Sequence, residues 1–303
     1  MSRVSNIEAQ QSKPITARSP IRALLTPRFK DMGGFSVLRS LPTTEVTTIG
    51  PWIYFDHLGP ATFAPGEGVN VRPHPHIGIA TVTYMFDGEL LHRDSLGSVQ
   101  PIRPGDVNLM VAGKGVVHSE RQSEQERADT HSVEGLQLWL VLPQECEHMD
   151  PAFYHYPASS LPITRVQGVP VRVMMGNTYG QDSPVKTFSD TLYFEAELAP
   201  GQTLQLPSCE ELGLYVVRGH IHCSGISVPS KTMAVFDCAQ ALSISAHEYS
   251  RVVLIGGAHL GPRIIDWNFV SSSQADIEQA KEKWRQGGFP NVPGDEEEFI
   301  PLP

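Results

Sequence analysis

The sequence predicts an all-β protein of two tandem barrel or sandwich units, followed by a short C-terminal helix and a tail. The 303 residues are enough for two domains of ordinary size. The 26 glycines and 25 prolines make up about 17% of the chain, against roughly 12% in an average protein, which indicates many turns between short strands. Two stretches of roughly 110 residues carry short β-branched and aromatic runs of similar style, the pattern of a duplicated β unit.

The first unit contains clear strand and turn signals. Residues 81–86 are rich in β-branched and aromatic side chains and end at Asp87-Gly88, which predicts a hairpin. Residues 135–142 alternate between two faces, as a strand does. Five prolines between positions 143 and 170 interrupt any such pattern and mark a domain boundary. The predicted division is a polar N-terminal arm (1–20), a first β domain (21–150), a second β domain (151–262), and a helix with a tail (263–303).

The second unit repeats the style of the first. Residues 192–198 alternate and are closed by a Pro-Gly turn, and residues 251–257 form a last buried strand. Residues 214–219 resemble residues 82–88, because each segment is a strand-like run closed by a glycine. The two units are therefore expected to share one architecture.

The chain is expected to end in a helix and an acidic tail. Ser271-Ser272-Ser273 with Asp276 predicts a helix cap, and two glycines at 287–288 can stop the helix. One face of this helix is apolar, which predicts that it docks on a domain. That face consists of Ile277, Ala280 and Trp284. The acidic run 294–298 is expected to be solvated, with contact to a partner protein as the alternative.

Composition and charge exclude several classes of protein. The net charge of −10 argues against a general phosphate-binding surface, so direct nucleic-acid binding is not expected. The first thirty residues lack an apolar signal-peptide core and no long apolar run follows, so we expect a soluble, cytoplasmic protein without membrane association. The four cysteines form no C-x-x-C pair and are expected to be reduced thiols. They are Cys146, Cys209, Cys223 and Cys238.

Two pairs of polar residues carry the chemistry. In residues 72–76 the alternating prolines favour an extended backbone, and His74 and His76 are separated by one residue. Residues i and i+2 of a strand point to one face, so both imidazoles can converge on one point. His118 and Glu120 have the same spacing further along the chain. Two such pairs on neighbouring strands would offer three nitrogens and one oxygen to a divalent first-row metal or zinc. The alternative is a set of satisfied polar residues or a surface histidine cluster.

The motifs around these residues resemble the cupin superfamily. The G-x5-H-x-H spacing that starts at Gly68, followed by Gly88, resembles the first cupin motif, and Gly115-x2-His resembles the core of the second. More narrowly, PHPHIGIATVTYMFDG, RDSLG, IRPGDVNLMVAGKGVVHSE and GLQLW resemble the pirin family of bicupins over about residues 68–142. The second half and the tail agree with pirins in general style. The resemblance implies two tandem cupin barrels of jelly-roll type.

The resemblance also implies one mononuclear metal centre in the N-terminal cupin. Its ligands, carried over by position, would be His74, His76, His118 and Glu120. The general cupin motif has a glutamate three or four residues after the second histidine, where this chain has Ala80 and Thr81. In pirins the carboxylate instead follows the third histidine by two residues, which is the place of Glu120. Fe(II) is the expected metal, with Mn, Ni, Co, Cu or Zn as alternatives.

The second cupin is expected to lack a metal site. Aligning Gly219 with Gly88 places other residue types near the ligand positions. These are Gln205, Pro207, Tyr249 and Arg251. Adventitious metal binding there would have to use His220, His222, Cys223 and His247.

Some pirins resemble quercetin 2,3-dioxygenases, which open the flavonol ring with O2 and release carbon monoxide. The resemblance therefore implies a small aromatic substrate and O2, with Glu120 as a metal ligand or as the base for the 3-hydroxyl proton. Because the protein is acidic, an apolar pocket must supply most of the binding of an anionic substrate. Candidate pocket walls, which could equally be barrel core, are Phe55, Phe63, Met85, Met110 and Trp139.

Other functions remain open at this point. A non-enzymatic, metal- or redox-responsive regulator would bind transcription factors or metabolic enzymes through a surface that changes with the metal. A cupin isomerase or a storage-like structural protein is a third class. The sequence does not predict the oligomeric state. His92, Arg93 and Asp94 could orient a ligand imidazole or could be plain surface charge.

Overall fold

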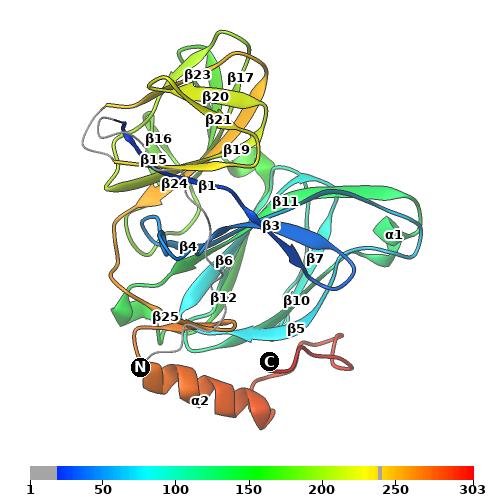
Figure 1. Cartoon of the computed structure of the whole chain (residues 1–303). Helices are drawn as coiled ribbons and strands as arrows, with labels where there is room; N and C mark the ends of the chain where they lie inside the picture. The colour runs from blue at the N-terminus through cyan, green and yellow to red at the C-terminus, as the bar shows by residue number, and fades with distance from the viewer. Residues whose placement is uncertain (1–18, 238–240) are drawn as a thin grey trace.

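The computed structural model describes residues 19–237 and 241–303 and shows two β-barrels with a C-terminal extension (Figure 1). The polar arm predicted over residues 1–20 lies almost wholly outside the described residues, and Cys238 lies outside them too. The prediction of an all-β chain with two tandem barrels, a short helix and a tail is confirmed. The two barrels lie one above the other in Figure 1, with the helix beneath the first.

The first barrel packs a seven-stranded sheet against a four-stranded sheet. The order in the larger sheet is β12 (Ala152–Tyr156), β9 (Val107–Val111), β6 (Ile79–Asp87), β11 (His131–Val141), β4 (Trp52–Phe63), β3 (Ser36–Leu41) and β2 (Arg28–Asp31). The order in the smaller sheet is β5 (Asn70–His76), β10 (Val116–Arg121), β7 (Leu90–Asp94) and β8 (Val99–Ile102). All pairs between these strands are antiparallel.

The second barrel repeats this arrangement. The larger sheet runs β1 (Ile21–Leu25), β22 (Met233–Phe236), β19 (Glu211–Arg218), β24 (Ser250–Gly257), β17 (Thr191–Leu198), β14 (Val169–Met175) and β13 (Ile163–Val166). The smaller sheet runs β18 (Thr203–Gln205), β23 (Ser243–Ala246), β20 (His220–Cys223) and β21 (Ile226–Pro229). Short connecting elements are α1 (Glu124–Arg127), η1 (Gln144–Cys146), η2 (Ala158–Ser160), β15 (Asn177–Thr178) and β16 (Gln181–Asp182).

The two seven-stranded sheets face each other across one shared apolar core. This core joins Val82 of β6 and Leu138 of β11 to Tyr215 of β19 and Val253 of β24. Strand β6 is buried over most of its length, because one face contacts the second barrel and the other faces the interior of the first. Trp52 links the two barrels. Its indole nitrogen lies 3.2 and 3.1 Å from two backbone carbonyl oxygens in the larger sheet of the second barrel.

Two strands cross the predicted domain boundaries. Residues 21–25, predicted within the first domain, form β1 and pair with β22 of the second barrel. Residues 152–156, predicted within the second domain, form β12 and pair with β9 of the first barrel. Burial explains why β1 joins the second barrel. Its alternating side chains Ile21, Ala23 and Leu25 become buried because β1 pairs with the edge strand β22.

The predicted hairpin at Asp87-Gly88 is wrong, although both flanking strands exist. Strand β6 ends at Asp87 and β7 begins at Leu90, but the two strands belong to different sheets. Gly88, with φ +73°, makes the corner at which the chain passes from the larger sheet to the smaller one. Gly219, with φ +84°, makes the same corner in the second barrel, between β19 and β20. The resemblance of the two segments therefore reflects equivalent corners of a duplicated fold.

The C-terminal extension folds back onto the first barrel. It contains β25 (Ile264–Asp266), β26 (Phe269–Ser271) and helix α2 (Gln274–Arg285). The cap prediction is confirmed, because the Ser273 side chain accepts a hydrogen bond from the Asp276 N–H. Ile277 and Ala280 of α2 are buried in a cluster with Val117 of β10, so the prediction that the helix docks on a domain is also confirmed. Among the described residues, no helix is long and apolar enough to cross a membrane.

A glycine pair tests the corner geometry. A Cβ at Gly88 would lie 2.2 Å from the Ser132 carbonyl oxygen, whereas a Cβ at Gly97, which also has positive φ, meets nothing within 4 Å. Gly97→Ala should therefore cost only the backbone penalty of about 1 kcal/mol, and Gly88→Ala, which adds a backbone clash, about 3 kcal/mol. Urea denaturation of both variants measures the difference. Equal losses of stability would contradict the assigned clash.

Candidate metal centre

Three imidazoles converge inside the first barrel. His74 and His76 lie on β5, and His118 lies on the adjacent β10 directly opposite His74. All three are buried, and one ligand nitrogen from each lies within 4.8 Å of the others. The Nε2 atoms of His76 and His118 are 3.1 Å apart, close to the roughly 3.0–3.4 Å expected for two nitrogens about 2.1 Å from one ion. The convergence predicted from the two spacings is thus present for the imidazoles.

A β-bulge helps to orient these rings. Arg72 and Pro73 lie together opposite the single residue Ser119, so the ladder is interrupted between His74 and the next pair. The carbonyl of Arg72 is 2.8 Å from His74 Nδ1. A carbonyl oxygen only accepts hydrogen bonds, so this contact places the ring proton on Nδ1 and leaves Nε2 free as a ligand.

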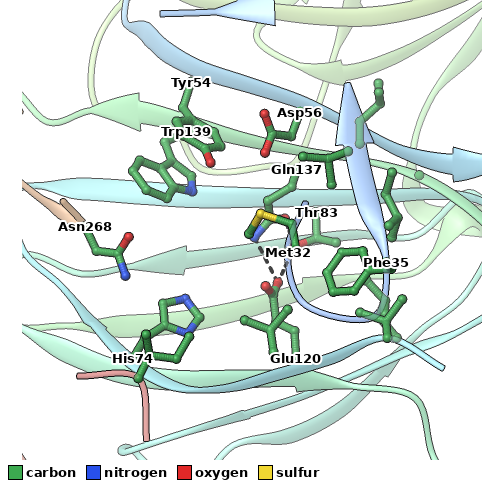
Figure 2. Close-up of a pocket in the computed structure, with 18 of the residues that line it drawn as sticks. Met32, Phe35, Tyr54, Asp56, His74, Thr83, Glu120, Gln137, Trp139 and Asn268 are labelled. Carbon is green, nitrogen blue, oxygen red and sulfur yellow. Dashed lines mark hydrogen bonds between the residues drawn. The ribbon is translucent and has the colours of Figure 1, made fainter. Parts of the chain in front are cut away.

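His76 is oriented in the same way by a remote segment. Its Nδ1 is 3.0 Å from the carbonyl oxygen of Asn268, in the turn between β25 and β26. Figure 2 shows Asn268 at the edge of the same cavity as His74. His118 Nδ1 is buried and has no hydrogen-bond partner among the described residues. Two of the three rings therefore have their tautomer fixed by backbone carbonyls.

Burial keeps the three rings neutral. It lowers the pKa of His74 from its ordinary 6.5 to about 4. It lowers the pKa of His76 and of His118 well below 6.5, and the neighbouring imidazoles act in the same direction. At neutral pH the nitrogen lone pairs are available without loss of a proton, which is the condition a transition metal requires of imidazole. The chemistry of this donor set thus fits a divalent transition metal.

Glu120 lies in the same cavity but outside the tight imidazole group. Its Oε1 accepts a hydrogen bond of 2.9 Å from Gln137 Nε2, shown as a dashed line in Figure 2. Thr83 donates to Gln137 Oε1 at 2.6 Å and lies 3.5 Å from the carboxylate. Burial raises the pKa of Glu120, and these two hydrogen bonds together with His92 oppose the rise. The predicted role of Glu120 as fourth ligand remains a proposal.

His92 and Asp94 are part of the interior rather than surface charge. His92 pairs with Glu120 across β7 and β10, and its ring stacks on Phe153 with centroids 4.4 Å apart. His92 Nε2 is 3.0 Å from an Asp94 carboxylate oxygen, and both side chains are buried. The ring centroids of His92 and His118 are 5.4 Å apart, so this pair packs beside the ligand cluster. Arg93 is only half-buried.

A cavity of about 360 Å³ opens above the imidazoles. One of its walls is aromatic: Tyr54 and Trp139 (Figure 2) stack with centroids 4.0 Å apart and planes 10° apart. Trp139 also contacts His76 edge-on. Of the five predicted wall residues, Met85 and Trp139 line the cavity. The other three are buried in the apolar core; they are Phe55, Phe63 and Met110.

Several lining residues were not predicted. Gln137 shares a strand face with Trp139, two residues away, so the alternation of residues 135–142 could have revealed it. Trp267, Asn268 and Ile300 also line the cavity, but they lie far along the chain and no local pattern connects them to β5.

The second barrel has no equivalent cluster among its described residues. Its interior is filled by apolar side chains such as Leu204, Ile221 and Ile244. His220, His222 and His247 form a row of neighbouring rings with centroid distances of 5.1 and 4.5 Å. In the described part of the chain, only the His74, His76 and His118 group brings three potential ligand atoms within 4.8 Å of one another.

Comparison with known proteins assigns both halves. The Pirin family model matches residues 34–140, and the Pirin C-terminal cupin domain model matches residues 193–290. A pirin-like protein from Caulobacter vibrioides is 43% identical over 280 residues, which is 91% of this chain and 97% of that protein.

Two solved structures share this fold. A quercetin 2,3-dioxygenase from Acinetobacter baumannii is 33% identical with a TM-score of 0.86, covering 92% of this chain and 94% of that one. A bacterial pirin from Escherichia coli, solved in complex with nickel(II), is 18% identical with a TM-score of 0.62, covering 78% of this chain and 98% of that one. This second likeness shows the common fold.

Removing one imidazole tests the ligand cluster. His76→Ala should lower metal affinity by more than about a hundredfold, because one of three convergent nitrogens is lost. His222→Ala, in the histidine row of the second barrel, is the matched control and should leave metal content unchanged. Elemental analysis after anaerobic loading and gel filtration measures both. Full metal content in His76→Ala would contradict the assignment.

Proposed function

Because this chain belongs to the pirin family of the cupin superfamily, we propose that its first barrel is a mononuclear metal centre of the quercetin 2,3-dioxygenase type, acting on flavonol-like substrates with O2. One observation carries the proposal: three neutral, buried imidazoles converge beside a cavity with stacked aromatic walls. The proposed metal is Fe(II), with Mn, Ni, Co, Cu or Zn as alternatives, and His74, His76, His118 and Glu120 are its proposed ligands.

When bound, the metal supplies a Lewis acid for a substrate oxygen and a redox partner for O2. The protein supplies the shape of the site. A planar aromatic substrate can lie against Tyr54 and Trp139, and the cavity volume of about 360 Å³ is within the range typical of small-molecule sites. The apolar wall supplies the binding energy that an acidic protein cannot supply to an anionic substrate by charge.

Glu120 is the proposed base for the 3-hydroxyl proton. Burial raises the pKa of its carboxyl group, which makes the carboxylate a stronger proton acceptor at neutral pH. The hydrogen bond from Gln137 goes to Oε1, and Thr83 lies 3.5 Å from the same oxygen, which leaves Oε2 for a metal ion or a substrate proton. Glu120 can therefore accept the proton either as a ligand or after detaching from the metal.

A metal-responsive regulator is the second candidate. It is favoured by one contact: His76 Nδ1 bonds to Asn268 of the C-terminal extension, and that extension also reaches the outer surface, where Phe299 is 57% exposed. A change at the metal could thus alter a surface segment. Partner capture with ferrous, ferric and metal-free protein distinguishes the two functions, since a regulator of this kind requires a partner list that changes with the metal.

Oxygen consumption tests the enzymatic proposal. Iron-loaded protein should consume O2 in the presence of quercetin and release carbon monoxide. Glu120→Gln should lower kcat/KM by about 10²- to 10⁴-fold, because it removes the proton acceptor while keeping the size of the side chain. Glu124→Gln, an exposed acid on α1, is the control and should retain full activity. Absence of oxygen uptake by the wild-type protein would favour the regulator.

A further inference from the structure

We propose that the C-terminal tail, residues 291–303, forms a wall of the metal cavity, and that Ile300 limits the size of the group that can reach the three imidazoles. This inference rests on the metal centre of the proposed function and adds a specificity-determining residue to it. It also assigns a role to the acidic segment 294–298, which was expected to be solvated.

Ile300 is held at the cavity by both of its backbone groups. Its N–H donates to the carbonyl oxygen of Pro73 at 2.8 Å, and its carbonyl accepts from the Trp284 indole N–H at 3.0 Å. Pro73 directly precedes the ligand His74, and its carbonyl lies in the bulge of β5. Ile300 lines the same cavity as His74 and His76. The tail ribbon passes close to His74 in Figure 2.

An ion pair anchors the rest of the tail to the ligand-bearing sheet. The guanidinium of Arg121 binds both carboxylate oxygens of Asp295, at 2.7 and 2.8 Å, and Glu298 lies 3.3 Å from the same group. Arg121 follows Glu120 on β10, so it points away from the cavity as Glu120 points into it. Val292 is buried among the helix contacts, which fixes the start of the tail.

The inward position of Ile300 is not a general property of the tail. Its neighbours Glu298 and Phe299 are exposed, whereas Ile300 is half-buried and lines the cavity. Most of the other lining residues lie on strands of the first barrel, so a substitution there also disturbs the packing of the barrel. A substitution at Ile300 keeps its two backbone bonds and changes only the size of the opening. Cavity size and barrel stability are therefore separable at this residue.

The test compares two chelators that bind iron through the same ring system. Wild-type protein loaded with Fe(II) is exposed to 1,10-phenanthroline or to the bulkier bathophenanthroline disulfonate. Rates are taken where they increase in proportion to chelator concentration, so that they report attack on the bound ion rather than its spontaneous release. Ile300→Ala and Ile300→Phe change the wall in opposite directions. Phe299→Ala is the matched control, since this neighbour is 57% exposed, contacts Trp284 edge-on and does not line the cavity.

If Ile300 is the wall, Ile300→Ala accelerates removal of iron by the bulky chelator several-fold and leaves the rate with phenanthroline nearly unchanged. Ile300→Phe slows the bulky chelator, and Phe299→Ala resembles the wild type. Unchanged ratios of the two rates in both Ile300 variants would overturn the proposal, as would an equal effect of Phe299→Ala.

A second readout separates this inference from the flavonol proposal. Quercetin binding, followed by tryptophan fluorescence, should weaken about tenfold in Ile300→Ala, because part of an apolar wall is lost. If the ratio of the two iron-removal rates changes but quercetin neither binds nor supports oxygen uptake, Ile300 is a wall residue and the flavonol substrate is wrong. If quercetin is consumed but the ratio of the two iron-removal rates is the same in all variants, the proposed function is retained and Ile300 does not limit access to the imidazoles.

Discussion

The antiparallel pairing of β5 with β10 is the constraint on which the metal centre depends. It places His118 opposite His74 and so brings two imidazoles from distant parts of the sequence to one spot. A slip of one residue would turn every side chain of β5 to the other face, so the register decides whether a site exists. The bulge beside His74 adds a second effect, because it removes two carbonyls from the ladder. Arg72 uses its carbonyl to orient His74, and Pro73 uses its own to hold Ile300.

Proline is suited to this bulge for a simple reason. It has no N–H to donate to a ladder, so it loses nothing where the ladder is interrupted, and its fixed φ stiffens the segment that carries the ligands. The neutral state of the imidazoles follows from the same arrangement. Each ring is shielded from water, and for His74 and His76 a backbone carbonyl satisfies the Nδ1 proton while Nε2 stays available. Backbone geometry thus prepares the donors before any ion binds.

The sequence predicted those parts of the site that depend on local spacing. The i, i+2 pairs identified the imidazoles, and the alternation around Trp139 already contained Gln137. The sequence did not predict which sheet each strand joins. The Asp87-Gly88 segment has the composition of a hairpin turn, but β7 pairs with β10 and not with β6, so the chain passes from one sheet to the other there. Asn268 and Ile300 were also invisible, since their contacts with β5 arise from docking of the C-terminal extension and not from any periodic pattern.

The two barrels differ in what fills them. The second barrel has an apolar interior and can be stabilised by its own core. The first has three imidazoles, a carboxylate and a cavity in its interior, beside two smaller apolar clusters. Further apolar burial is supplied from outside. The second barrel covers one face of its larger sheet, and helix α2 with the tail covers the outer face of β5 and β10. On this view the second barrel and the C-terminal extension support a first barrel whose interior holds three imidazoles and a cavity.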